Sequence, residues 1–204
     1  MRSLRDQFYR GRFLGDHFRH LILKMVPLSS CTITLSKTSY TYDGQYKSPS
    51  VTVKDGSKVL TRNIDYKTAG YSNNLRAGTT SVKIIGTDDQ SGTINKTYYS
   101  GTVTKTFTIK PKKPAGFTLS SPKTRTMKIT LKETEGISGY EIKYSTSKKF
   151  TAKTSNVIST KKTTKSLTGL QKGKTYYVKV RTYKTSDGKI YYSEYSAVKS
   201  IKLK

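Results

Sequence analysis

The stretch TVTKTFTI, residues 102–109, decides the fold class, because apolar and polar side chains alternate along it. Successive side chains of a β-strand point to opposite faces, so Val103, Phe107 and Ile109 would share one face. Threonine fills the positions between these odd-numbered ones. This period of two predicts a strand with one buried face and one wet face, as in an antiparallel sheet that covers a core.

The same alternation recurs at short intervals on both sides of this stretch. Before it, alternating runs lie at residues 32–35, 50–53 and 81–84, and the turn dipeptides between the strands include Asp43-Gly44, Asp55-Gly56 and Asn73-Asn74. After it, alternation returns at residues 127–131, 140–144 and 176–180, and Asp187-Gly188 predicts a hairpin turn. A sandwich takes ~100 residues, so a chain of 204 residues has room for two. We therefore predict an all-β fold of two tandem immunoglobulin-like β-sandwiches.

The composition agrees with strands rather than with disorder. Hydrophobic residues make up only 33% of the chain, but 16 tyrosines and many threonines are present. Aromatic and β-branched side chains favour a pleated, half-buried surface, and disordered chains are poor in both. No run of 18 apolar residues occurs, so the sequence predicts no transmembrane helix.

Residues 1–31 form a separate, basic N-terminal segment. Its first 28 residues hold five of the nine arginines but only one lysine, and apolar residues recur at near-helical spacing among them. This pattern suggests an amphipathic basic helix, and three interpretations stay open. The segment is a degenerate export signal, a membrane-surface helix, or a disordered or irrelevant tail, and the tail is favoured. Leu28-Ser29-Ser30-Cys31 also resembles a bacterial lipobox, in which Cys31 would carry lipid.

Residues 32–110 carry a resemblance to a known bacterial repeat. YTYDGQYKSPSVTV (40–53), IDYKTAGYSNN (64–74), AGTTSVKIIG (77–86) and YYSGTVTKTFTI (98–109) follow one another in the order of the YDG/MBG-type bacterial Ig-like repeat. The segment from Thr87 to Thr97 is longer than the usual turn of that family. The resemblance implies an Ig-like domain of a large secreted or wall-bound protein of a Gram-positive bacterium.

Residues 117–204 resemble a fibronectin type III domain, and the two prolines of residues 111–116 (PKKPAG) predict a short, extended linker before it. The clearest piece of this resemblance is LQKGKTYYVKV, residues 170–180. It implies that Tyr176 is the corner tyrosine, whose hydroxyl bonds to nearby backbone. Leu131 stands where that family has a strand-B tryptophan, and no Arg-Gly-Asp occurs in the loop around Asp187.

We find no pattern that predicts catalysis, a metal site or a cofactor. Both histidines, His17 and His20, lie in the N-terminal segment, and Cys31 is the single cysteine. A Ser-His-Asp arrangement or a zinc site would therefore lack ligands, and no phosphate-cradling loop occurs. The adjacent carboxylates Asp88 and Asp89 are interpreted as a solvated turn rather than a Ca²⁺ site. We expect a protein that is not an enzyme.

Charge is the main functional signal. The formal net charge is +27, and residues 113–204 alone carry +16, from 21 basic and 5 acidic residues. We expect five cations of the second sandwich to line one outward sheet face and attract a polyanion by counterion release: Lys128, Lys132, Lys143, Lys179 and Arg181. Ordinary solvation and protection of sheet edges by lysine explain the same residues equally well.

Three tyrosines, Tyr98, Tyr191 and Tyr195, are candidates for stacking on sugars, because one member of each adjacent tyrosine pair should face outward. Tyr99, which the repeat family retains, is expected to pack in the core.

The sequence thus favours a non-catalytic, extracellular or cell-surface structural or interaction module, acting as a spacer or adhesion unit among other modules of a larger protein. The alternative is a binding module for an anionic polymer, such as teichoic acid or a sulfated host glycan. Sequence-specific nucleic-acid binding is not expected, because no motif for it occurs.

Overall fold

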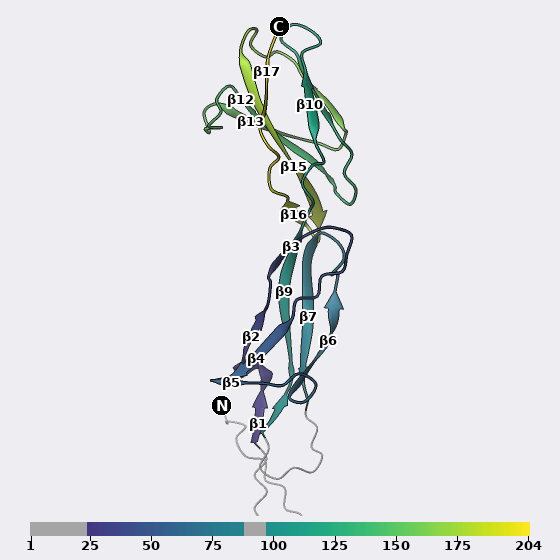
Figure 1. The fold of residues 1–204 in the computed structure, drawn as a ribbon, viewed down its shortest axis with the longest axis vertical. Coiled ribbons are helices and arrows are strands. Elements are labelled where there is room, and N and C mark those ends of the chain that lie inside the picture. The colour runs from purple at the N-terminus through teal and green to yellow at the C-terminus, as the bar shows by residue number, and fades with distance from the viewer. Residues whose placement is uncertain (1–23, 88–96) are drawn as a thin grey trace, which may run out of the picture.

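Two β-sandwiches are stacked end to end in the computed structural model, and the molecule is long and narrow (Figure 1). The structure describes residues 24–87 and 97–204. Those residues form strands, turns and a single short 3-10 helix, η1 (Leu28–Ser30), so the all-β prediction is confirmed. We call β1–β9 the N-terminal module and β10–β17 the C-terminal module.

The N-terminal module packs a three-stranded sheet against a four-stranded one. The three-stranded sheet, β2-β4-β5, is antiparallel and consists of β2 (Thr32–Leu35), β4 (Val51–Asp55) and β5 (Lys58–Val59). The four-stranded sheet, β3-β9-β7-β6, consists of β3 (Ser39–Thr41), β9 (Thr102–Lys110), β7 (Gly78–Gly86) and β6 (Tyr66–Ser72). In it β3 runs parallel to β9, whereas β7 is antiparallel to both of its neighbours. A third, two-stranded sheet pairs β1 (Lys24–Pro27) with β8 (Thr97–Ser100) in parallel.

The core of this module follows the predicted alternation. Phe107 and Ile109 of β9 are buried, and the threonines that alternate with the odd-numbered residues along this strand lie on its outer face. Val82 and Ile84 of the neighbouring strand β7, and Val53 of the facing sheet, have no exposed surface. Tyr99 is also buried in this core, as predicted from its place in the repeat.

The N-terminal segment predicted for residues 1–31 extends too far along the chain. Residues 24–27, which the sequence pattern assigned to a basic helix or tail, form β1, and the adjacent Leu28 is completely buried in the core of the N-terminal module. The parallel partner of β1 lies some 70 residues away, at Thr97–Ser100, so a local pattern does not reveal the pairing. Residues 1–23 lie outside the described part of the chain.

The C-terminal module has the same two-sheet plan. One sheet is antiparallel, with the order β10-β11-β14, and consists of β10 (Phe117–Ser120), β11 (Met127–Leu131) and β14 (Thr164–Leu167). The other has the order β13-β12-β15-β16, with β17 also pairing with β15, and consists of β13 (Ser155–Thr160), β12 (Gly139–Ser145), β15 (Thr175–Ser186), β16 (Lys189–Tyr192) and β17 (Lys199–Lys202).

The core between these sheets contains the side chains that alternation predicted. Met127, Ile129 and Leu131 of β11 face Val178 and Val180 of β15, and all five are buried. Leu131, which the resemblance places where that family has tryptophan, is part of this core. The amide of Gln171 donates a hydrogen bond of 3.2 Å to the hydroxyl of Tyr176, as expected of a corner tyrosine.

The predicted hairpin turn at Asp187-Gly188 is confirmed. Ser186 pairs with Lys189, so two residues close the hairpin, and both have positive φ, 49° at Asp187 and 70° at Gly188. Asp and Gly tolerate this conformation, which matches the twist of the strands that they join. The turn lies at the end of the C-terminal module that approaches the N-terminal one (Figure 1).

In the described part of the chain, no helix has the length and hydropathy needed to cross a membrane.

Candidate interaction surfaces and the junction between the modules

The described residues contain no cluster of three or more His, Cys, Asp or Glu side chains that could hold a metal ion. The two histidines and the Asp88-Asp89 pair lie outside those residues. Cys31 is a half-buried free thiol, and burial raises its pKa, which lowers its reactivity as a nucleophile.

The five candidate cations do not share one face, so that geometric expectation is wrong. Lys128 lies on β11 and Lys132 directly follows it, in the three-stranded sheet, whereas Lys143, Lys179 and Arg181 lie on β12 and β15, in the other sheet. The outward faces of two packed sheets point in opposite directions. The chain crosses from one sheet to the other between β11 and β12, and alternation within each strand carries no information about that crossing.

The outward face of β15 carries an alternating stack of cations and aromatic rings, which we call the aromatic–cation ladder. Lys179 Nζ lies 4.6 Å from the ring centre of Phe150 and 4.5 Å from that of Tyr195. The guanidinium carbon of Arg181 lies 4.7 Å from the ring of Tyr195 and 3.7 Å from the ring of Tyr192. The ladder therefore runs Phe150, Lys179, Tyr195, Arg181, Tyr192.

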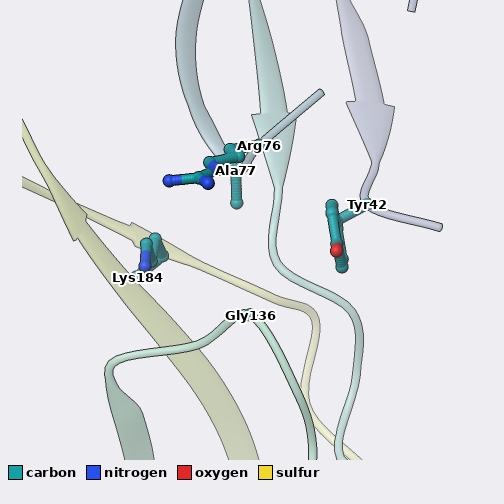
Figure 2. Close-up of a pocket in the computed structure, with 5 residues that line it drawn as sticks. All are labelled: Tyr42, Arg76, Ala77, Gly136 and Lys184. Carbon is teal, nitrogen blue, oxygen red and sulfur yellow. The ribbon is translucent and has the colours of Figure 1, made fainter. Parts of the chain in front are cut away.

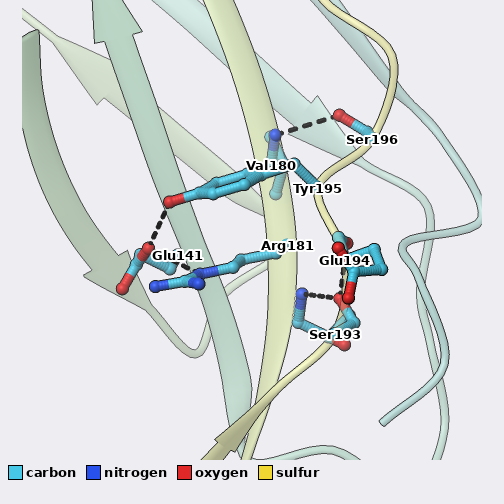
Figure 3. A network of polar contacts seen from close by, with 8 residues as sticks. Glu141, Val180, Arg181, Ser193, Glu194, Tyr195 and Ser196 are labelled. Carbon is cyan, nitrogen blue, oxygen red and sulfur yellow. Dashed lines mark hydrogen bonds and ion pairs between the residues drawn. The ribbon is translucent and has the colours of Figure 1, made fainter. Parts of the chain in front are cut away.

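Glu141 of β12 anchors this ladder from the neighbouring strand (Figure 3). Its Oε1 accepts hydrogen bonds from Arg181 Nε at 2.8 Å and from the Tyr195 hydroxyl at 2.7 Å, and only 6% of the residue is exposed. Burial alone would raise the pKa of Glu141, but the bonds from Arg181 and Tyr195 outweigh it and hold the pKa below its ordinary value. Burial, together with the bond to Glu141, raises the pKa of Tyr195 to about 12. Arg181 therefore has its charge partner within the module and is a poor candidate for capturing a polyanion.

The last two residues of β16 and the four residues after it, 191–196, make contacts that repeat every three residues, and we call them the clasp segment. Ser193 and Ser196 each bond twice to β15: the serine amides donate to the carbonyls of Thr182 and Val180, and the serine hydroxyls accept from the amides of the same two residues. Three of these four bonds are 3.0 Å long, and that from Ser196 N to Val180 is 2.7 Å. Paired with β15 in this way, the serines replace a regular ladder where β16 has ended (Figure 3).

The other residues of the clasp segment divide between two directions. Tyr192 and Tyr195 turn toward the ladder, whereas Tyr191 and Glu194 reach the N-terminal module. The three pairs, 191 and 194, 192 and 195, 193 and 196, thus lie on three faces, which is the period of a polyproline II chain. The repeat Tyr-Ser-Glu-Tyr-Ser, residues 192–196, has a period of three, so the periods of a strand (two) and of a helix (3.6) do not reveal it.

Each of the three candidate sugar-stacking tyrosines is buried or makes a contact within the molecule. Tyr98 is 3% exposed, so the expectation that one of the pair Tyr98 and Tyr99 faces outward is wrong. Successive side chains of β8 point to opposite sides, so burial of both means that both sides of this strand are covered. Tyr195 lies in the ladder, and the Tyr191 hydroxyl is hydrogen-bonded across the junction.

The junction between the modules is made by direct contacts. The hydroxyls of Tyr191 and Thr79 lie 2.5 Å apart, and Lys110 Nζ lies 3.4 Å from Glu194 Oε1. The predicted linker, residues 111–116, also contacts the C-terminal module, since the Thr182 hydroxyl donates a 2.6 Å bond to the carbonyl of Lys112.

Two glycines allow the modules to approach closely. A Cβ atom at Gly136 would lie 3.1 Å from the Tyr42 ring, and one at Gly78 would lie 3.0 Å from the Ser186 hydroxyl oxygen. Both glycines have positive φ, 73° and 151°. The backbone of each module therefore rests against a side chain of the other.

Comparison with known proteins supports a fibronectin type III domain in the C-terminal half, where residues 112–199 match the family model of that domain. No curated protein sequence matches the chain. A two-domain fibronectin type III segment of chicken tenascin has a similar structure, with 15% identity and a TM-score of 0.53 over 84% of this chain and 98% of that one. The FN1-FN3 domains of chicken CNTN1 match 63% of this chain at 14% identity and a TM-score of 0.41, and the chain spans 44% of that structure.

The family match and the similarity to the tenascin segment agree with the fold described above, two tandem β-sandwiches. Fibronectin type III domains are generally non-catalytic interaction or spacer modules, and they usually occur outside the cell or on its surface, often in multidomain proteins. Because such folds carry many unrelated functions, the particular role of this chain must be argued from its own surfaces.

Proposed function

We propose that this chain is a non-catalytic spacer unit of an extracellular or cell-surface protein, in which two sandwiches form one stiff rod. We also propose that the N-terminal module is a bacterial Ig-like repeat of the YDG/MBG type, with the domain boundary in residues 111–116. The order of Tyr42-Asp43-Gly44, Asp65-Tyr66 and Tyr71-Ser72-Asn73-Asn74 supports that assignment.

The observation that carries the proposal is the contacted junction. Flexible linkers leave neighbouring domains free to reorient, and relative motion is the usual expectation for domains with small interfaces. Here Tyr191, Glu194 and the carbonyl of Lys112 are bonded across or into the junction, and Gly136 rests on the Tyr42 ring. A spacer that must project another activity away from a surface benefits from such a fixed angle.

Residual dipolar couplings of the full chain test this proposal. In the wild-type protein, couplings from both modules should fit one alignment tensor. The variant Tyr191→Ala/Glu194→Ala should need two tensors, whereas the control Tyr46→Ala/Glu133→Ala, at exposed residues that make none of the junction contacts described above, should behave as wild type. A wild-type protein that already needs two tensors would refute the stiff rod.

A second candidate function is binding of an anionic polymer. The three described carboxylates of the N-terminal module are engaged internally: Asp43 pairs with Lys47 at 2.5 Å, Asp65 accepts from the Thr61 amide at 2.7 Å, and Asp55 accepts from the Tyr99 hydroxyl at 3.2 Å. Most of the lysines of both modules lie at exposed positions. The surface potential is therefore dominated by cations, which favours contact with polyanions.

Co-sedimentation with purified Gram-positive cell walls, with and without teichoic acid and over a salt series, tests this second function. Binding that falls with salt and disappears after removal of teichoic acid would identify the polymer class. Absence of binding even at low salt would exclude the wall polymer as a partner of this surface.

A further inference from the structure

The junction contains a shallow cleft of about 300 Å³, and both modules contribute to it. Tyr42, Arg76 and Ala77 line it from the N-terminal module, and Gly136 and Lys184 line it from the C-terminal module. In Figure 2 the side chains of Arg76 and Lys184 lie near one another on one side, and the Tyr42 ring lies on the other. Neither sandwich alone would form this site.

The two cations of the cleft differ from Arg181 of the ladder because they form no ion pair with a carboxylate within the described part of the chain. Arg181 is bonded to Glu141, whereas no carboxylate in residues 24–87 or 97–204 forms an ion pair with Arg76 or Lys184. Asp43, next to Tyr42, is already paired with Lys47. Glu135 adjoins Gly136 but is exposed and does not line the cleft.

The chemistry of the lining suits a single anionic group on a hydrated, non-planar ligand. A guanidinium can bind a phosphate, sulfate or carboxylate through two parallel hydrogen bonds, and an ammonium adds a point charge beside it. The Tyr42 ring is fixed against Gly136 and offers one apolar wall and one hydroxyl. Successive stacked rings, on which nucleic-acid bases would lie, are missing from the lining residues.

We propose that this cleft binds one anionic group of an anionic glycopolymer of the teichoic acid or acidic glycan type, with Arg76 and Lys184 as the ligating cations. A volume of about 300 Å³ is at the lower end of the range for ligand pockets, so the cleft takes one charged unit and the rest of the polymer runs over exposed lysines. The site rests on the stiff rod proposed above, because its two cations come from different modules. The contacted junction would hold them together before the polymer binds, which lowers the cost of binding.

Isothermal titration calorimetry of the full chain with poly(glycerol phosphate) oligomers, at 150 mM salt, tests this site. At that salt concentration the attraction of scattered, exposed lysines to the polymer is largely screened. Arg76 and Lys184, which would contact the same anionic group directly, still contribute to binding. Arg76→Ala/Lys184→Ala should weaken binding by about tenfold or more, as expected from loss of charge-assisted bonds. Lys172→Ala/Lys174→Ala removes the same charge at the far tip of the C-terminal module, where Gly173 bonds to Leu203, and should change binding by less than about threefold.

Each other outcome has a definite meaning. Equal losses in the two variants, or no binding by the wild-type protein at this salt, would overturn the proposal. A heparin-derived oligosaccharide that shows the same dependence on Arg76 and Lys184 would assign the site to acidic glycans in general. The same dependence with single-stranded DNA of equal charge would overturn the assignment to an anionic glycopolymer. Residual dipolar couplings of Arg76→Ala/Lys184→Ala should still fit one tensor, so failure of the cleft and failure of the rod are separable.

Discussion

Replacing Arg181 with methionine should destabilise the C-terminal module by about 3 kcal/mol, because it leaves Glu141 as a largely buried carboxylate without its cation. This value is at the lower end of the ~3–5 kcal/mol for breaking buried pairs, since 26% of the Arg181 side chain is exposed and water can partly replace it. Methionine keeps an apolar stem between the rings of Tyr192 and Tyr195, so most of the loss is electrostatic. With a urea m-value of ~1–1.5 kcal/mol/M, the midpoint should fall by about 2–3 M.

The measurement is urea unfolding of the full chain, followed by the amide NMR signals of Val180 and Thr182. These signals report the C-terminal module alone, which is needed because two modules need not unfold together. The variant Glu141→Gln/Arg181→Met carries no buried charge and should regain about 1.5 kcal/mol relative to Arg181→Met. If Arg181→Met shifts the midpoint by less than about 0.5 M, or if the two substitutions have additive effects, Glu141 and Arg181 do not act as a pair.

Three further outcomes follow from the geometry. The pKa of Glu141 lies below its ordinary value of 4.5, so the stability that its ionised form contributes is present at neutral pH and is lost as the pH falls from about 4.5 through the lower folded-state pKa. Urea midpoints measured from pH 7 to pH 3 should therefore fall less steeply for Glu141→Gln than for wild type, and equal slopes would contradict this. Leu28→Ala should destabilise the N-terminal module by about 2–5 kcal/mol, because Leu28 is completely buried; thermal unfolding followed by circular dichroism should show this loss, whereas a neutral effect would mean that Leu28 is not part of the core. Gly86→Ala should destabilise the same module, because a Cβ at this position would lie 2.2 Å from the carbonyl oxygen of Tyr99. The comparison is Gly101→Ala, where a Cβ meets no atom within 4 Å and only the positive φ is unfavourable. Equal losses of stability in the two variants would refute the close approach at Gly86.

Cys31 illustrates how the structure limits interpretations that the sequence left open. Lipidation of Cys31 would require cleavage just before it, which would remove β1 and Leu28 from the N-terminal module. Leu28 contributes one of the largest fully buried side chains. The lipobox-like match at residues 28–31 is therefore better explained by core packing of Leu28 and by the short helix η1 that begins with it.

The fold was predictable because alternation and turn chemistry are local. The spacing of apolar residues within one strand is enough to predict its buried face. Examples are Phe107 and Ile109 on β9, and Met127, Ile129 and Leu131 on β11. Asp187-Gly188 likewise needs only its own backbone preference to define a hairpin. The surfaces were not predictable by this route, because alternation tells which side of a strand a lysine occupies but not which sheet the strand joins. Lys128 and Lys179 have equivalent patterns and lie on opposite faces.

The clasp segment shows how the missing information enters through the third dimension. Its serines form their hydrogen bonds only because β15 runs beside them in the folded chain. Its tyrosines stack only because Arg181 and Lys179 lie opposite their rings. Because Tyr191 and Glu194 belong to the same short segment, any change that releases the serines or the ladder also releases the two side chains that contact the N-terminal module. The fold of the C-terminal module and the angle of the rod are then one property, so loss of the Arg181–Glu141 pair should loosen the junction even though neither residue touches it.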